Sequence, residues 1–321
     1  MRWLVTACLF VMLTRPCFAW FEGGHHLVAV MAYEDLTQDE QRLIQKILTS
    51  HPRFAEDFVL PAGVEGQDES DRWRMGCAAY WPDTARSQPD WNRPSWHYQL
   101  GSTLTIGNVK PPANPGPVPA TATLKTQELH IAQAVELCRH ILRDHSRSDA
   151  DRAIAICWLG HLVADAHQPC HAGSLYVERV FPEGDRGANL ILAKQAKTLH
   201  LVWDGLLGPK FDAGDIRRRS REIKGDEPTW KQATEAATQK NGDEPLTWLA
   251  ESAEYGRSHV YAPEILSAVE AAKRGGQPVE TVDLSEEYLQ AAGKLARVRA
   301  AFASQRLKRI LQSDLQSSSA K

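Results

Sequence analysis

This 321-residue sequence has no excess of basic over acidic residues, few strand-forming segments and few long apolar runs. Lys and Arg number 37 against 40 Asp and Glu, so no strong basic field exists to hold duplex DNA by phosphate neutralisation alone. No stretch approaches the roughly 20 apolar residues that a membrane-spanning helix needs. Because 43% of the residues are apolar, the chain is unlike a disordered or collagen-like protein and can bury a substantial core.

The first 19 residues are typical of a secretory signal peptide. A short positively charged start is followed by an apolar stretch at 3–14 and a small-x-small cleavage site at 17–19. We therefore expect an exported protein, secreted or periplasmic, that begins at Trp20. The alternative is a lipid anchor on Cys8, but the apolar stretch continues past that residue. Removal of the signal takes away two Arg, which leaves 35 basic and 40 acidic residues, a formal charge of −5.

Four cysteines follow the signal segment, and an even number in an exported protein favours two disulfide bonds. Cys138 and Cys157 lie at equal distances from the turn between two predicted helices, so they are expected to face one another. Cys77 and Cys170 would then form the second bond. Buried free thiols are the alternative for all four residues.

The hydrophobic pattern is mostly helical, and strand signals are nearly absent. The predicted helices cover residues 25–36, 37–48, 126–145, 150–165, 198–207, 228–239, 245–258 and 284–312. Thr37 and Glu40 have the spacing of a capping box at the start of the second helix. Residues 101–122 are rich in Pro, Gly and Thr and predict a long surface loop, and 174–188 predict another. We expect a single all-α domain over residues 20–321.

Chemistry is concentrated in HLVADAHQPCH, residues 161–171. His161 and Asp165 are four residues apart, so on a helix they project from one face as two ligands of one metal must. A Gln-Pro dipeptide then ends the helix and presents His171 from a turn. His200 and Asp204 repeat the four-residue spacing. Either pair alone is a common chance pattern of core or surface residues, but the two pairs and the third histidine together indicate metal binding.

Three further segments carry candidate ligands beside aromatic residues. At the expected mature N-terminus, WFEGGH, two glycines allow a tight turn that brings His25 beside the α-amine and carbonyl of Trp20. WPDTAR contains Asp83, and WHY contains His97. Taken singly, Asp83 is equally a candidate helix cap and His97 a candidate core imidazole. The remaining histidines have no partner at ligand spacing.

The ordered set WxxGGH, WPDTAR, WHY, HLVADAHQPCHAG, DRGAN and LHLVWD resembles the zinc-dependent single-strand-specific nucleases and 3′-nucleotidases of the S-one/P-one type, which include mung bean nuclease. The resemblance covers nearly the whole of residues 20–321, including WLAESAEYGRSHVY and the helical C-terminal segment. It implies the all-α fold of those enzymes and of the related zinc phospholipases C, with three zinc ions per chain.

The resemblance also assigns roles to individual residues. Nine ligands fall into three sets: Asp83, His97 and His161 with Asp165 as a bridge; Asp165, His25 and the amine and carbonyl of Trp20; and His171, His200 and Asp204. Asp83, Arg86 and Asp165 would form the catalytic centre. Substrate-binding residues would be Tyr98, which stacks a nucleobase, Arg86, which lies near the phosphate, and Asn189. Asp185 would support the ligands from behind.

The implied activity is hydrolysis of single-stranded DNA and RNA to 5′-phosphate products, with 3′-nucleotidase activity. Single-stranded nucleic acid and 3′-nucleotides would be the substrates, and neither a stable membrane association nor an obligate protein partner is expected. The sequence departs from the family at Phe21, Pro82 and Ala188, where smaller residues are usual, and has Gly205 where some fungal members have Asn. The alternatives are a lipid phosphodiesterase of the phospholipase C type and a zinc-binding protein without catalysis.

Overall fold

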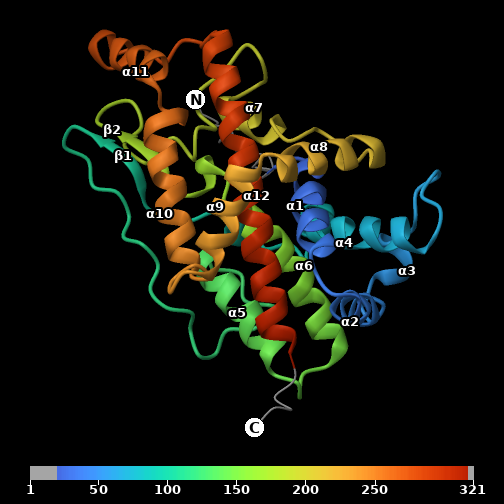
Figure 1. Ribbon diagram of the computed structural model, residues 1–321. Coiled ribbons are helices and arrows are strands. Elements are labelled where there is room, and N and C mark those ends of the chain that lie inside the picture. The colour runs from blue at the N-terminus through green and yellow to red at the C-terminus, as the bar shows by residue number, and fades with distance from the viewer. Residues whose placement is uncertain (1–19, 317–321) are drawn as a thin grey trace, which may run out of the picture.

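The computed structural model describes residues 20–316, so the predicted signal segment lies outside the described residues. Over this range the chain forms twelve α-helices and one short pair of strands, which confirms the predicted all-α class (Figure 1). The α-helices are α1 (Glu22–Glu34), α2 (Gln38–Leu48), α3 (Phe54–Asp57), α4 (Gln67–Thr84), α5 (Ile131–Arg143), α6 (Asp149–Ala166), α7 (Leu199–Gly205), α8 (Ala213–Gly225), α9 (Glu227–Thr238), α10 (Pro245–Tyr255), α11 (Pro263–Gly275) and α12 (Glu286–Leu315). The strands are β1 (Ser102–Ile106) and β2 (Ser174–Val177), and the short helical turns are η1 (Ala85–Ser87), η2 (Pro94–His97), η3 (Pro169–His171) and η4 (Gly256–Val260).

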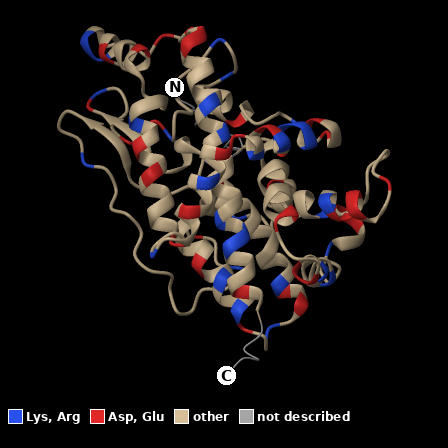
Figure 2. Cartoon of the chain, in the orientation of Figure 1, with Lys and Arg blue, Asp and Glu red and all other residues tan. Residues whose placement is uncertain are grey.

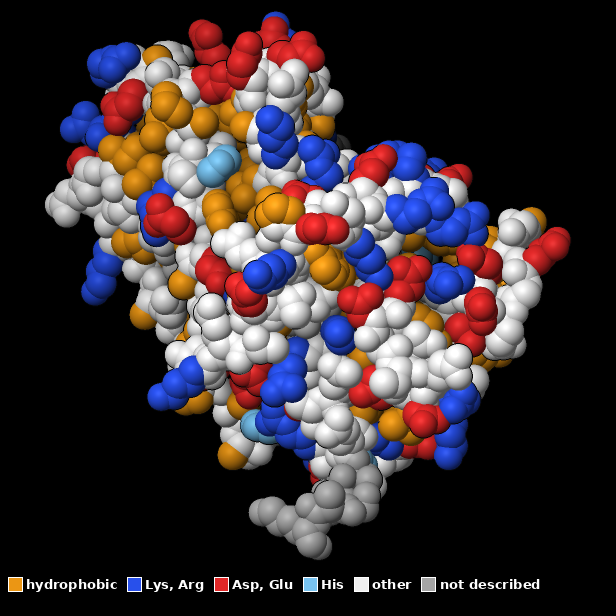
Figure 3. Space-filling view, viewed as in Figure 1, with side chains coloured by type: hydrophobic (Ala, Val, Ile, Leu, Met, Phe, Trp, Pro, Cys, Tyr) orange, Lys and Arg blue, Asp and Glu red, His pale blue; other side chains and the backbone are white. Residues whose placement is uncertain are grey.

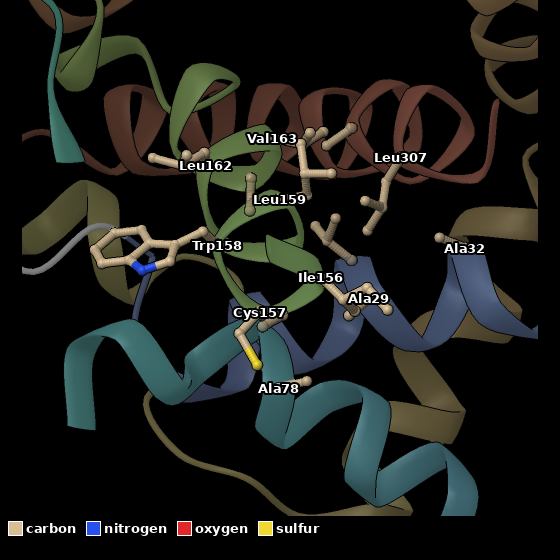
Figure 4. Packing of buried hydrophobic residues seen from close by; sticks show 14 of the residues in the cluster. Ala29, Ala32, Ala78, Ile156, Cys157, Trp158, Leu159, Leu162, Val163 and Leu307 are labelled. Carbon is tan, nitrogen blue, oxygen red and sulfur yellow. The ribbon is translucent and has the colours of Figure 1, made fainter. Parts of the chain in front are cut away.

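Helix α6 is the centre of the larger hydrophobic core. Every residue from Arg152 to Ala166 is buried, and the helix contacts α1, α2, α4, α5 and α12. Its apolar side chains point to several sides: Figure 4 shows Trp158, Leu162 and Val163 among those that pack against the surrounding helices. A helix that is apolar all round must be enclosed in this way. The predicted ligands His161 and Asp165 are therefore held inside the most constrained element of the fold.

The contact between α4 and α6 depends on a glycine. A Cβ atom at Gly160 would lie 2.9 Å from the Cβ of Ala79, closer than side chains normally approach. The glycine allows the two helices to pack tightly, and His161 Nδ1 then donates a hydrogen bond to the carbonyl of Ala79 over 2.8 Å. The packing of the core thus sets the orientation of a predicted ligand.

A second, smaller hydrophobic cluster surrounds the two strands, α7, α11 and the first half of α12. β1 and β2 pair in parallel, so both predicted loops begin with a strand, contrary to the sequence prediction. The strands have only five and four residues, and each finds its partner about 70 residues away, which a local pattern does not reveal. The rest of the first loop runs along the edge of the molecule from β1 to α5 (Figure 1).

Eight predicted helices are present, with ends that differ by a few residues. The capping box is confirmed: Glu40 N donates to Thr37 Oγ1 over 3.3 Å, and Thr37 N donates to Glu40 Oε2 over 2.8 Å. The sequence analysis missed α3, α4, α8 and α11. In α4 the polar first half and Pro82 near the end conceal the helical period. This omission matters because α4 carries Asp83.

The predicted disulfide bonds are absent. Cys77, Cys138 and Cys157 are free thiols, so neither the bond between Cys138 and Cys157 nor that between Cys77 and Cys170 is formed. Burial, with a smaller contribution from the nearby Cys77 and Cys138, raises the pKa of Cys157 well above its ordinary value. Cys77 Sγ instead donates to the carbonyl of Asp57 over 3.4 Å, while Cys170 belongs to the other hydrophobic cluster. The two predicted helices do pack against each other, but the equal distance of Cys138 and Cys157 from the turn did not place their thiols in bonding positions.

Charges of both signs are interspersed over the outer helices (Figure 2). The face in Figure 3 likewise mixes Lys and Arg with Asp and Glu. The densest basic run is on α8, and three of its arginines pair with carboxylates: Arg217 with Glu69, Arg218 with Asp215 and Glu222, and Arg219 with Asp215. Within residues 20–316, no helix has the length and apolar character required to span a membrane.

Candidate metal centre

Four predicted ligands from three segments meet on one side of α6. Asp83 ends α4, His97 ends the turn η2, and His161 and Asp165 lie one turn apart on α6. His161 Nε2 is 2.7 Å from His97 Nδ1 and 3.2 Å from Asp165 Oδ2, and Asp83 Oδ1 is 3.8 Å from His97 Nδ1. All four residues are buried.

His25 on α1 joins this group from the other side of Asp165. Its ring stacks on that of His161 with centroids 4.0 Å apart, and its Nε2 lies 3.5 Å from Asp165 Oδ1. Asp165 Oδ2 faces His161 and His97 instead, at 3.2 and 3.4 Å. One oxygen of this carboxylate thus faces His25 and the other faces His161 and His97, an arrangement that suits a bridging ligand.

Trp20 precedes α1 and is fully buried between the two ligand helices. Its indole Nε1 donates to the carbonyl of Ala164, the residue before Asp165, over 3.1 Å. The next amide, Phe21 N, donates to the carbonyl of Asp204 over 3.0 Å. The Trp20 side chain is therefore attached to α6 and the following amide to α7.

The third predicted set also comes together. His171 in η3 and His200 and Asp204 on α7 are buried, with 3.1 Å between the Nε2 atoms of the two rings and 3.3 Å from His200 Nε2 to Asp204 Oδ2. Each ring donates its Nδ1–H to a main-chain carbonyl, His171 to His97 and His200 to Gly187. The Nε2 atoms of the two rings face each other, as two ligands of one cation would.

Buried polar atoms without a hydrogen-bond partner gather at the first two sets. They are both carboxylate oxygens of Asp165, Oδ2 of Asp83, both ring nitrogens of His25 and Nε2 of His97. Because some nine in ten buried polar groups are normally hydrogen-bonded, such a concentration indicates missing cationic partners. All three groups consist of His and Asp, and within each group the ligand atoms lie within 4.8 Å of one another. This nitrogen and oxygen donor set fits zinc with positions left open for substrate.

The pKa shifts of three histidines and of Asp165 favour metal binding. Burial, together with neighbouring imidazoles and Arg86, lowers the pKa of His25, His97 and His171 well below the ordinary value, so these rings are neutral donors. Burial raises the pKa of Asp165 to about 6, against the opposing effect of His161. The metal-free carboxylate is thus held at a cost in free energy, which a bound cation would relieve.

Comparison with known proteins agrees with this geometry. The sequence profile of the S1/P1 nuclease family matches residues 20–316. The chain belongs to the S1/P1 nuclease family. It is 21% identical over 209 residues to Endonuclease 3 of Arabidopsis thaliana, which covers 64% of this chain and 60% of that protein. It is 22% identical over 213 residues to Endonuclease 5 of the same plant, with 64% and 62% covered. The chain thus spans about three fifths of the length of these relatives.

Two of the residues that the S1/P1 resemblance assigns to the substrate, Arg86 and Tyr98, lie beside predicted ligands. Arg86, in the turn η1 after α4, is largely buried, and its Nε is 2.6 Å from Asp83 Oδ1. Tyr98 follows His97 and is 40% exposed, with its ring 5.2 Å from that of His130. Asn189 is partly buried, and its Nδ2 donates to the carbonyl of Arg186 over 2.9 Å. The amide of Asn189 therefore closes its own loop.

Asp185 organises that loop through both of its carboxylate oxygens. Its Oδ1 accepts the amide of Leu175 over 2.9 Å, and its Oδ2 accepts the hydroxyl of Tyr261 over 2.8 Å. Burial raises the pKa of Asp185 to about 6, although these donors lower it. Residues 186–188 all have positive φ angles, including the non-glycine Arg186 and Ala188. This strained segment supplies the Gly187 carbonyl that orients His200.

Tyr261 and Gln168 are the contributors to this centre that the sequence analysis missed. Tyr261 lies in WLAESAEYGRSHVY, which carried only the resemblance. Gln168 lies inside HLVADAHQPCH, where it was assigned only to ending the helix. A polar residue that is fully buried between two ligands is the signal, but burial is not visible in the sequence.

Proposed function

We propose that this protein is a zinc-dependent nuclease that hydrolyses single-stranded DNA and RNA to 5′-phosphate products, with 3′-nucleotidase activity and three zinc ions per chain. The observation that carries the proposal is the position of Asp165, one oxygen of which faces His25 while the other faces His161 and His97. Family membership supports nuclease chemistry, and the names of the two plant relatives describe them as endonucleases.

The proposed ligands follow the three groups of side chains. Asp83, His97 and His161 would hold one zinc and share Asp165 with a second, which His25 and the amine and carbonyl of Trp20 complete; His171, His200 and Asp204 would hold the third. When bound, zinc supplies a Lewis acid that makes water nucleophilic near neutral pH and neutralises charge on phosphate oxygens. Trp20 offers its amine only if the bond after Ala19 is cut, so the proposal includes an exported protein cleaved at that bond.

The chain's own residues would position and stabilise the phosphodiester. The guanidinium of Arg86 is held by Asp83 and largely buried, so it is placed to stabilise charge that develops on phosphoryl oxygens. Tyr98, one residue from His97 and 40% exposed, would stack a nucleobase. A paired duplex base cannot reach such a platform without unstacking, which favours single strands.

The charge distribution favours recognition of the phosphate by a few local groups, and not by a broad basic surface. The chain after residue 19 has a formal charge of −5, and three of the arginines on α8 are paired with carboxylates. Attraction of a polyanion would therefore come from the metal centre and Arg86. We expect its salt dependence to be weak beside that of proteins that neutralise many phosphates.

The test is an assay of a chain that begins at Trp20 and is loaded with zinc. Single-stranded DNA, single-stranded RNA and a 3′-mononucleotide should all be hydrolysed, duplex DNA much more slowly, and chelation followed by zinc should abolish and restore the activity. A choline phospholipid is the fourth substrate, because Leu190 and Leu192 are each 45% exposed on the loop after Asp185. Hydrolysis of the lipid alone would assign the chain to lipid phosphodiesterases, and hydrolysis of none would leave only zinc binding.

A further inference from the structure

Gln168 lies fully buried between two elements of the third metal group. Its Nε2 donates to Asp204 Oδ1 over 2.7 Å, and its Oε1 accepts the amide of Cys170, the residue before His171, over 2.6 Å. The orientation of the side-chain amide is unambiguous, because a carboxylate only accepts and a main-chain N–H only donates. One side chain thus connects η3 to α7, the two elements that carry all three ligands.

The hydrogen bond from Gln168 fixes the rotation of the Asp204 carboxylate. With Oδ1 held by the amide, Oδ2 is the oxygen that lies 3.3 Å from His200 Nε2. His200 Nε2 is in turn 3.1 Å from His171 Nε2. The two nitrogens and one oxygen therefore face a common point, and the carboxylate would bind a metal through one oxygen, which leaves room for substrate.

Gln168 is itself firmly held by the core. Its main-chain amide donates to the carbonyl of Asp165 over 3.0 Å, so it is attached to the residue proposed to bridge the other two ions. The two preceding carbonyls are also bound: Ser252 Oγ donates to Ala166 over 2.6 Å, and Arg299 Nε donates to His167 over 3.3 Å. These contacts join the end of α6 to α10 and α12.

The geometry points to Gln168 as a positioning residue that sets the zinc affinity of the group formed by His171, His200 and Asp204. This inference rests on the proposed function, because it assumes that the group holds zinc. Gln168 does not ligate the ion; it selects the oxygen of Asp204 that does, and it fixes the turn that presents His171. Loss of a hydrogen-bond partner to a metal ligand typically lowers metal affinity about 10- to 100-fold.

The deciding variant is Gln168→Met, which has a similar length and no hydrogen-bonding amide. Gln305→Met is the matched control, since Gln305 is also a buried glutamine that donates from Nε2 to a carboxylate, Asp35 Oδ2 at 3.0 Å, but on α12. Zinc per chain is measured against increasing concentrations of a competing chelator, with circular dichroism as a check on folding. Gln168→Asn, which keeps the amide but is one methylene shorter, is the second variant if the first does not fold.

We expect Gln168→Met to lose one of three zinc ions at a free zinc concentration about 10- to 100-fold higher than the wild type, and to keep the other two. Gln305→Met should keep all three at wild-type affinity. Wild-type zinc affinity in Gln168→Met, or equal loss of all three ions, would overturn the positioning role while leaving the nuclease activity of the wild type standing. A wild type that binds no zinc and cleaves no single strand would overturn the proposed function and this inference with it.

Discussion

The candidate metal centre has two parts that differ in what holds their side chains in place: a paired part, Asp165 and the predicted ligands around it, and a single part, His171, His200 and Asp204. Apart from His97 on the turn η2, the paired part rests on α1, α4 and α6, which pack against one another in the larger core. The single part rests on the one-turn η3, the short α7 and a loop with three successive positive φ angles, in the smaller cluster.

This difference shows two ways of fixing a ligand. In the paired part, tight helix packing orients the rings, as in the bond from His161 to Ala79 across the contact that Gly160 allows. In the single part, hydrogen bonds from Gln168 and to Gly187 replace helix packing. In the paired part we therefore expect zinc content and activity to depend mainly on the ligands themselves. In the single part we expect them to depend more strongly on residues that support the ligands.

The largest effect is expected for Asp165→Asn. An amide carries no charge to balance two cations, so the variant should lose more than one zinc and about 10³-fold or more in turnover. Elemental analysis after dialysis and initial rates on single-stranded DNA measure both. Asp149→Asn, at the exposed start of the same helix, is the control and should resemble wild type. Retention of three zinc ions with full activity would remove the bridging role.

Blocking the N-terminus should have the next largest effect. A chain that carries Gly-Ser before Trp20 presents an amide nitrogen where the amine is proposed to bind, and an amide is a far poorer zinc donor than an amine of pKa about 8. We expect one zinc fewer than in a chain that begins at Trp20, with a matching loss of nuclease rate. Equal zinc content and equal rates in the two chains would show that the terminus is not a ligand.

Arg86→Ala should keep its zinc but lose about 10²-fold in turnover, the scale for removal of one donor that stabilises developing charge. Its partner Asp83 remains as a ligand, so zinc analysis separates a catalytic from a structural loss. Arg218→Ala removes an exposed ion pair on α8 and serves as the control. If both variants turn over at the wild-type rate, Arg86 is no more than a salt-bridge residue.

Gly187→Ala tests the loop that supports the single part. A Cβ there would lie 2.2 Å from the carbonyl oxygen of Cys170, and the φ of +60° is unfavourable for alanine. We expect a loss of about 1–3 kcal/mol in the free energy of unfolding and selective loss of the third zinc. Thermal denaturation and zinc analysis measure these changes, with Gly116→Ala, which meets no neighbouring atom, as the control. Normal zinc content in Gly187→Ala would show that this loop does not support zinc binding by the single part.

The smallest expected effect is in proton release. Because the pKa of Asp165 in the metal-free protein is raised to about 6, this carboxyl is about half protonated at pH 6 and ionised at pH 8. Zinc binds the ionised form, so binding should release more protons at pH 6 than at pH 8. Calorimetry in buffers of different ionisation enthalpy measures the difference, and Asp185→Asn should retain it. An equal release at both pH values would contradict the raised pKa.

The sequence predicted most of the helices and the eight His and Asp side chains that the structure brings together in three groups. Spacing on a helix is a local property, so His161 with Asp165 and His200 with Asp204 could be found from periodicity alone. The grouping of Asp83, His97 and His25 around them came from the resemblance, since it depends on how α1 and α4 pack on α6.

What the sequence did not predict depends on contacts between distant segments. The parallel pairing of β1 with β2 joins residues about 70 positions apart, and Tyr261 reaches Asp185 from 76 positions away. The thiols of Cys138 and Cys157 lie on packed helices but form no bond, because side-chain direction as well as spacing decides a disulfide. Gln168 was overlooked because nothing local distinguishes a buried amide from a helix-ending one.

The most direct test of the metal centre is X-ray anomalous scattering at the zinc absorption edge, from crystals of a chain that begins at Trp20. The account predicts three peaks in each molecule: one on each side of Asp165, and a third among His171, His200 and Asp204. A single peak at Asp165, or no peak in any of the three groups, would contradict it.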